Sequence, residues 1–533
     1  MTQGKHNTTE TLKKWYNFRL AIVAEGIVAG ALAGIVVVFY RFALEKALGF
    51  AKYMYSLQLE KIWLIPIWFV LLICGGLLVG FLLKKEPMVS GSGIPQVEGI
   101  LHNKLDMSWW RVMLGKLAGG IICIGAGLSL GREGPSIQIG AAAGQGFSKL
   151  FKRVRLEEKF MITCGASAGL SAAFNAPLAG AMFALEELHK NFSPIVMVSS
   201  LAASLTADFV SKEFFGMKPV FNFRQLNPIP LDKYLLLILL GILVGLLGIL
   251  FNKSIFKAQD IYAALKMPQQ AKPVIPFVLA GIVGLFLPEV LGGGHELINS
   301  LAVTDFSLKM LALLIAVKFL FTMASFGSSA PGGIFLPLLA LGALFGALYG
   351  SLLQDVFGLN GNFAANFAIL GMAGYFSAIV KAPITGCILI TEMTGSFSHL
   401  LSVGLVCLVA YMTADVLNSR PIYEALLERL LNKGKWKPET GKEKKAVIET
   451  AVCMGSLLDG KRIREMDWPA RCLVVGIKRG DTEFIPNGDT KIAAGDYLII
   501  LADEADAREI RECLAEAGGN CLLEGNRNRQ AES

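Results

Sequence analysis

GASAGLSAAFNAPLAGAMFALEE at residues 165–187 is matched by GMAGYFSAIVKAPITGCILITEM at residues 371–393. Both stretches are apolar and interrupted by Gly and Pro, so each predicts a broken helix. Matched broken helices in two halves of an apolar chain are typical of membrane transporters whose substrate site lies between the repeats. The alignment leaves open whether the halves run parallel or inverted. Identical pairs include Gly165/Gly371, Ala176/Ala382, Pro177/Pro383, Gly180/Gly386 and Glu186/Glu392.

The composition around these repeats is that of a membrane protein. Hydrophobic residues make up 54% of the 533 residues and charged residues 17%, against about 25% charged in soluble proteins. The 57 glycines suit transmembrane helices that pack closely through small residues. These values exclude a secreted mini-protein, a collagen-like chain, a coiled coil and a disordered protein. Apolar tracts recur from residue 20 to residue 417, which predicts a multi-pass protein in the cell membrane.

Charge divides the chain into two parts. Of the 103 residues from position 431 onward, 35 are charged, against 57 of the first 430. The net charge of +8 lies on the apolar part, and we interpret it as cytoplasmic loop residues rather than a nucleic-acid surface. Lys13, Lys14 and Arg19 precede an uncleaved first span, which predicts a cytoplasmic N-terminus, and we expect the C-terminus to be cytoplasmic as well. We expect a cytoplasmic segment at 1–19, a transmembrane domain at 20–430, a linker at 431–445, a small regulatory domain at 446–519 and a polar tail at 520–533.

No residue pattern predicts catalysis. The nine cysteines are scattered without metal-ligand spacing, and the five histidines form no ligand set. His295 in GGGHEL is interpreted as a loop or cap residue. Triads, phosphate-binding loops and dinucleotide fingerprints are not found in the sequence. We therefore expect a protein that is not an enzyme and that uses no metal or cofactor.

Three glycine-rich motifs share one pattern: GSGIP at 91–95, GREGP at 131–135 and GGIFLP at 332–337. Glycine allows close backbone approach, and Pro in a first helical turn starts a helix without losing a bonded N–H. Several helix N-termini meeting inside a membrane would bind an anion through their free amides. The alternative is that each motif is only a tight turn or a packing point. The residues concerned are Gly91, Gly93, Pro95, Gly131, Arg132, Gly134, Pro135, Gly332, Gly333 and Pro337.

GSGIP, GREGP followed by SIQIG, and GGIFLP, in this order and spacing, resemble the CLC family of chloride channels and chloride/proton exchangers. The resemblance covers about residues 19–430. It implies an all-α polytopic membrane protein with two inverted repeats of tilted and partial helices, assembled as a homodimer with one pore in each subunit. Chloride is the expected anion, because Ser92 stands where nitrate-preferring members have proline.

The resemblance also implies individual roles. Ser92, the backbone amides of Ile334 and Phe335, and Tyr423 in RPIYEAL would bind the central chloride. Glu133 of GREGP would be the gating glutamate, which occupies an anion position when ionised and leaves it when protonated. An intramembrane carboxylate is costly and so points to function independently of the resemblance. The alternative for Glu133 is a buried structural pair with Arg132 or Lys116.

Glu187 bears on the choice between exchanger and channel. It falls where the family's exchangers keep a proton-accepting glutamate facing the cytoplasm, with Glu186 beside it to help hydrate the proton path. The resemblance therefore implies a secondary active chloride/proton antiporter that needs no ATP. The alternative at Glu187 is a carboxylate at a helix end that merely meets water. The alternative function is a passive chloride channel gated by Glu133 and regulated by a ligand on the C-terminal domain.

The C-terminal part resembles the TrkA-C (RCK-C) module of potassium-transport regulators, over about residues 446–519. Strands are predicted at 472–477, 483–486 and 496–501, with a turn at Asn487-Gly488 and a helix at 504–517. We expect a small cytoplasmic α+β domain that dimerises and binds a regulatory ligand, such as a cyclic dinucleotide. The alternatives are a passive dimerisation module, or a protein that acts mainly as a ligand sensor.

Overall fold

The computed structural model describes most of the chain. The described residues are 8–190, 192–221, 223, 229–304, 306–357, 363–433, 445–469, 472–480, 482–503, 510 and 513–514. Residues 1–7, residues 434–444 of the predicted linker, most of the predicted helix at 504–517 and the predicted tail at 520–533 lie outside them. The chain divides into two compact units, residues 1–436 and 437–533, with the division inside the predicted linker. Each unit is described by itself.

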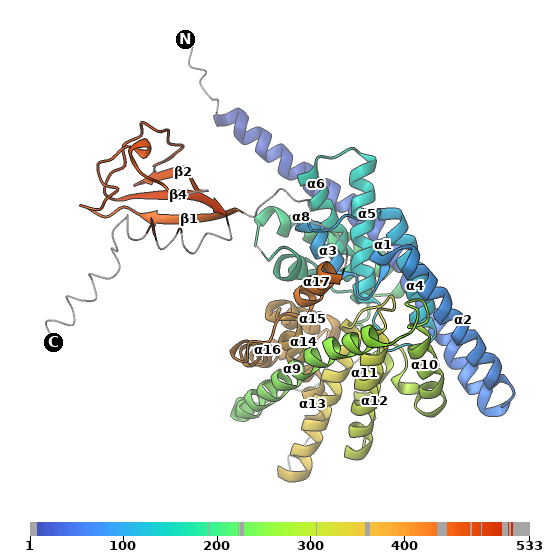
Figure 1. The fold of residues 1–533 in the computed structure, drawn as a ribbon. Helices are drawn as coiled ribbons and strands as arrows, with labels where there is room; N and C mark the ends of the chain where they lie inside the picture. The colour runs from blue at the N-terminus through green and yellow to red at the C-terminus, as the bar shows by residue number, and fades with distance from the viewer. Residues whose placement is uncertain are drawn as a thin grey trace. The chain divides into compact units, whose positions relative to one another are not determined.

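The first unit is built from helices, as Figure 1 shows. Its first half contains α1 (Thr8–Glu60), α2 (Leu64–Lys85), η1 (Pro87–Val89), α3 (Ile94–Leu101), α4 (Trp109–Gly125), α5 (Glu133–Leu150), α6 (Arg155–Phe174), α7 (Pro177–Phe183), the π-helical turn η2 (Ala184–His189) and α8 (Pro194–Phe215). Its second half contains η3 (Leu231–Lys233), α9 (Tyr234–Ala264), α10 (Val274–Phe286), η4 (Pro288–Val290), α11 (His295–Leu301), α12 (Leu308–Gly327), α13 (Phe335–Phe357), α14 (Phe363–Val380), α15 (Pro383–Thr394), η5 (Phe397–His399), α16 (Leu400–Val416) and α17 (Ile422–Lys433).

Helix lengths confirm the prediction of a multi-pass chain with partial helices. Seven of the described helices are long and apolar enough to cross a bilayer. Helices α3, α7 and α11 have only seven or eight residues, well short of the roughly 20 needed to span. The broken repeats of the sequence form two consecutive helices each, α6 with α7 and α14 with α15. Asn175, in a left-handed conformation, ends α6, and only Ala176 separates it from Pro177, which starts α7.

Small residues allow equivalent helix pairs in each half to pack at close range. A Cβ atom on Gly140 of α5 would lie 2.1 Å from the carbonyl oxygen of Gly165 of α6. In the second half, a Cβ atom on Gly342 of α13 would lie 2.7 Å from the carbonyl oxygen of Gly371 of α14. Any side chain at these positions would separate the helices, which explains why glycine recurs in both halves.

The two halves exchange helix caps. The carboxylate of Glu186 accepts hydrogen bonds from the backbone amides of Ile384 (3.2 Å) and Thr385 (2.7 Å), at the start of α15. The carboxylate of Glu392, near the end of α15, accepts hydrogen bonds at the start of α7, including one from the amide of Ala179 (2.8 Å). Each segment therefore caps the N-terminus of its equivalent with a residue near its own C-terminus. Equivalent helices that meet in this way are antiparallel, so the repeats are inverted.

The second unit contains a four-stranded antiparallel sheet in the order β1-β4-β2-β3. The strands are β1 (Lys445–Ala451), β2 (Cys472–Arg479), β3 (Thr482–Phe484) and β4 (Asp496–Asp503). The three predicted strands are confirmed, and β1 was not predicted. One face of the sheet is buried through Ile448, Ile477, Leu498 and Ile500.

An ion pair at the end of β4 stabilises this sheet. The buried carboxylate of Asp496 accepts two hydrogen bonds of 2.7 Å from the Arg479 guanidinium and one of 2.9 Å from the Ala493 amide. Burial raises the pKa of Asp496, but these hydrogen bonds lower it by more, so its pKa lies below the ordinary value. The stabilisation is therefore present above about pH 4 and is lost as the pH falls through the folded-state pKa.

We expect Glu186→Ala and Glu392→Ala to destabilise the first unit by similar amounts, about 0.5–2 kcal/mol each, because each removes a helix cap. Thermal unfolding of the full-length protein in detergent measures both midpoints. Glu289→Ala, at an exposed position in η4, is the control and should leave the midpoint unchanged. A lower unfolding midpoint in only one of the two variants would contradict the equivalence of the two caps.

We expect Arg479→Met to destabilise the second unit by about 1–2 kcal/mol at neutral pH, because it leaves a buried carboxylate without its main donor. Half-exposed Arg479 is partly screened by solvent, which keeps the loss at the lower end of the range for such groups. The difference in free energy of unfolding between the variant and the wild type should become smaller below about pH 4. Hydrogen exchange of β2 and β4 amides in the full-length protein, corrected for the intrinsic effect of pH on exchange, measures this free energy. Arg462→Met, which removes exposed ion pairs, should cost no more than about 1 kcal/mol.

Candidate functional site

The three glycine-rich motifs meet through main-chain hydrogen bonds. The amide of Gly131 donates to the carbonyl of Gly333 (2.6 Å), and the amide of Gly333 donates back to the carbonyl of Gly131 (2.8 Å). The amide of Gly332 donates to the carbonyl of Gly91 (3.0 Å). The motifs lead directly into α3, α5 and α13, so these contacts bring three helix N-termini into one region. The three motifs are therefore in direct contact with one another and are not three separate turns.

Glycine is required at this junction for steric reasons. A Cβ atom on Gly131 would lie 2.3 Å from Oε2 of Glu133, and one on Gly134 would lie 2.3 Å from Oγ of Ser92. Gly93 has φ +99°, a conformation that other residues rarely adopt. The glycines thus provide the space that the Glu133 and Ser92 side chains occupy.

Glu133, the first residue of α5, is fully buried. Neither of its carboxylate oxygens has a hydrogen-bond partner within the described part of the chain. The Nε atom of Arg132 is 4.0 Å from Oε1 of Glu133, while its Nη1 atom donates to Glu45 at 3.1 Å. The buried amine of Lys116 donates instead to main-chain carbonyls, including that of Gly91 (2.7 Å). A close structural pair between Glu133 and Lys116 is therefore not formed.

A cavity of about 390 Å³ lies beside this junction. Its lining includes Glu45 and Arg132 from the ion pair just described, together with Lys52 and Glu296, which also form an ion pair. His295 lines the same cavity as the first residue of α11, so it lies within a helix and not in the loop or at the cap position that was predicted for it. Acidic and basic side chains therefore line the cavity together with Arg132, the neighbour of Glu133.

Two of the predicted chloride ligands carry buried hydroxyl groups with unused hydrogen-bonding capacity. Ser92 and Tyr423 are almost completely buried, and neither hydroxyl has a hydrogen-bond partner among the described residues. Ser92 precedes α3 directly, and Tyr423 is in the first turn of α17. Buried hydroxyls normally have partners, so two unpartnered ones next to an anionic side chain indicate a site for a small polar ligand.

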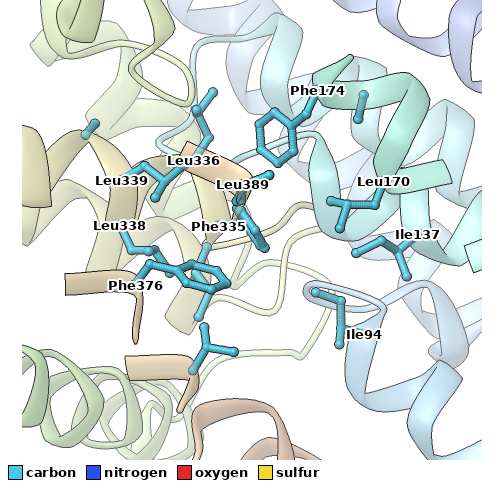
Figure 2. Packing of buried hydrophobic residues seen from close by; sticks show 14 of the residues in the cluster. Ile94, Ile137, Leu170, Phe174, Phe335, Leu336, Leu338, Leu339, Phe376 and Leu389 are labelled. Atoms are coloured by element: carbon cyan, nitrogen blue, oxygen red, sulfur yellow. The ribbon is translucent and has the colours of Figure 1, made fainter. Parts of the chain in front are cut away.

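Ile334 and Phe335 lie at the start of α13, where backbone amides have no partner within the helix. The ring of Phe335 packs against Phe376 at 4.8 Å between centroids and against Phe174 at 5.3 Å. Figure 2 shows this apolar packing around Phe335 and, close by, Ile94 of α3. Free amides at an apolar, dry position suit a weakly hydrated anion such as chloride.

Glu187 is the second buried carboxylate. It lies in η2, its side chain is 3% exposed, and its Oε1 atom has no hydrogen-bond partner among the described residues. The adjacent Glu186 is occupied as the cap of α15 and accepts a further hydrogen bond from the Thr385 hydroxyl (2.7 Å).

Two functional features were missed by sequence reasoning. Lys318 is the second-half equivalent of Lys116, and its buried amine donates to the carbonyls of Val290 (2.8 Å) and Gly292 (2.7 Å). The sequence carried a signal for Lys318, because a lysine recurs inside an apolar helix of each half. The second feature is a hydrogen bond between Lys190 and Glu98 at 2.9 Å, for which the sequence carries no local signal.

Taken together, these residues suit reversible binding of a small anion and of protons. The described residues contain no group of three or more His, Cys, Asp or Glu side chains that could hold a metal ion. Two unpartnered hydroxyls, free helix amides and two buried carboxylates provide hydrogen-bond donors for an anion and two places for a proton.

Comparison with known proteins agrees with this arrangement. The family model described as voltage gated chloride channel matches residues 75–415, and the TrkA-C domain model matches residues 447–515. The H(+)/Cl(-) exchange transporter ClcA of Vibrio parahaemolyticus is 35% identical over 438 residues, which cover 80% of this chain and 93% of the relative. The protein of the same name from Vibrio vulnificus is 38% identical over 384 residues, which cover 70% of this chain and 82% of the relative.

The fold is also similar to that of a solved transporter structure. A solved structure described as a slow cyanobacterial Cl-/H+ antiporter has 31% sequence identity and a TM-score of 0.74, covering 77% of this chain and 98% of that chain. With matching motifs, fold and sequence, this chain belongs to the voltage gated chloride channel (CLC) family and carries a TrkA-C domain after its transmembrane part.

Proposed function

We propose that this protein is a secondary active antiporter that exchanges chloride for protons. The observation that carries the proposal is the pair of buried carboxylates, Glu133 and Glu187, each with at least one oxygen that has no hydrogen-bond partner among the described residues. A passive anion pore needs no second carboxylate of this kind. Relatives that are named as H(+)/Cl(-) exchange transporters support the same function.

In the proposed cycle, ionised Glu133 competes with chloride for one position. Its carboxylate lies near the backbone amide of Leu336, where the α13 dipole stabilises negative charge. Protonation removes that charge, and the side chain then leaves the position to chloride. Glu187 receives the proton from the cytoplasm, so each proton that passes is linked to a movement of chloride.

The proposed chloride ligands are the hydroxyl groups of Ser92 and Tyr423 and the backbone amides of Ile334 and Phe335. The glycines and prolines of the three motifs hold these donors in place. We assign Glu186 to capping α15, in place of the predicted part in hydrating the proton path, because three hydrogen bonds already engage its carboxylate. The protein then acts as a transporter and not as an enzyme.

We further propose a homodimer in the bacterial inner membrane with cytoplasmic termini. In the second unit, one face of the sheet exposes Val447, Leu473 and Tyr497. This uncovered apolar face supports pairing of two C-terminal domains, with a small regulatory ligand such as a cyclic dinucleotide bound between them.

We expect wild-type protein in liposomes to move protons uphill when driven by a chloride gradient. Glu187→Gln should abolish proton movement and retain chloride flux, because an amide of the same size cannot carry a proton. Proton uptake and chloride efflux, measured on the same vesicles, give both rates. Chloride flux without proton movement in the wild type would instead identify a channel.

We expect Gly134→Ala to weaken chloride binding by about tenfold or more, because the new Cβ would lie 2.3 Å from Oγ of Ser92 and displace it. Calorimetric titration of the detergent-solubilised protein with chloride measures the affinity. Gly404→Ala in α16 is the matched control, since its nearest neighbour, Sγ of Cys387, would be at an ordinary 3.7 Å. Equal affinities for both variants would contradict the placement of chloride next to Ser92.

A further inference from the structure

Lys190 links two carboxylates beside η2. Its amine is 2.9 Å from Oε1 of Glu98 and 3.6 Å from Oε2 of Glu424. Glu98 is 3% exposed, whereas Glu424 is 58% exposed. Solvent screens the pair with Glu424, so the hydrogen bond to buried Glu98 is the stronger contact.

Lys190, Glu98 and Glu424 come from three different elements of the fold. Lys190 follows η2 directly and has φ +52°, so the chain turns sharply after the π-helical turn. Glu98 lies on α3, the helix that GSGIP begins, and Glu424 lies next to Tyr423 on α17. Lys190, three residues after Glu187, therefore connects the end of η2 with α3 and α17.

Helix α3, which carries Glu98, packs against η2, which carries Glu186 and Glu187. Lys190 pairs with Glu98 and with Glu424 of α17. Among these described groups Lys190 is the one cation. Lys104 acts in addition on Glu98. Helix α6 brings Lys159 toward His189, whose Nε2 atom pairs with the Thr163 hydroxyl at 2.7 Å.

Two buried carboxylates that interact do not both remain ionised readily, so they compete for one proton. Glu98 receives a charged hydrogen bond from Lys190, which favours its ionised form. Glu187 has an unpartnered oxygen and no such donor among the described residues. The proton therefore goes to Glu187.

We infer that Lys190 is a positioning residue for proton transport: by holding Glu98 ionised, it directs the incoming proton to Glu187. The inference rests on the proposed exchange function and deepens it. Without Lys190, Glu98 would take up the proton itself, at a position that does not lead on to Glu133. Chloride binding would remain, because Lys190 contacts none of the proposed chloride ligands in the described structure.

The test uses the full-length protein in liposomes. Lys190→Met should lower the number of protons moved per chloride by about tenfold, the effect of a change of one unit in proton affinity, with chloride flux within about twofold of wild type. The pH at which proton uptake is half-maximal should shift as well. Lys190→Arg should keep the coupling, because it preserves the charged donor to Glu98.

The double variant Lys190→Met/Glu98→Gln is the decisive measurement. Removing the competing carboxylate should restore coupling to near the wild-type value. Lys381→Met is the matched control: Lys381 also has positive φ (+65°) and pairs with a carboxylate, Asp415, at 2.8 Å in the second half. Its coupling should equal that of the wild type.

Each outcome has a distinct meaning. Wild-type coupling in Lys190→Met, an equal fall of proton and chloride fluxes, or no recovery in the double variant would overturn the role of Lys190. If wild-type protein moves no protons, the exchange function fails instead. Loss of coupling in Glu187→Gln together with normal coupling in Lys190→Met would leave exchange intact and remove only this inference.

Discussion

The main-chain bridge between Gly131 and Gly333 is the constraint on which the site depends. Two reciprocal hydrogen bonds join equivalent loops of the inverted halves, and they force both loops to approach without side chains. Glu133 and Phe335 follow two residues later in each loop, at the first positions of α5 and α13. The bridge thus fixes one carboxylate opposite one free helix N-terminus, and a shift of either loop would separate them.

The two inverted halves hold the site with equivalent contacts, although the site itself has different side chains in each half. Lys116 and Lys318 hold equivalent loops through the same pair of carbonyl contacts, and the caps of α7 and α15 are exchanged in the same way. The chemistry is confined to one copy, since Glu133 corresponds to Phe335 in the other half. The second half contributes amides and apolar packing instead. A symmetric frame with one charged and one neutral loop gives a small anion a single preferred position.

The sequence predicted the features that depend on local patterns. Glycine spacing revealed the loops at Gly131 and Gly333, and the short apolar runs CLVVGI and DYLIIL revealed β2 and β4. Strand β1 was missed because KAVIETA is short and mixes polar with apolar residues. The alignment of the repeats left their direction open, because direction depends on contacts such as that between Glu186 and Thr385, and only the family resemblance implied inversion. The contact between Lys190 and Glu98 joins residues 92 positions apart, and only the folded chain brings them together.

Exchange of unlike ions requires paths that meet at one point and separate elsewhere. Glu133 provides the meeting point in the proposed cycle, because proton and chloride exclude each other there. The π-helical turn η2 provides the separation, since it directs adjacent carboxylates to different tasks. Glu186 is engaged by α15, while Glu187 is buried and its Oε1 atom has no hydrogen-bond partner among the described residues. In the proposed cycle, a regular helical turn in place of η2 would move the two carboxylates relative to α15, so the π-helical turn determines which of them is left for the proton.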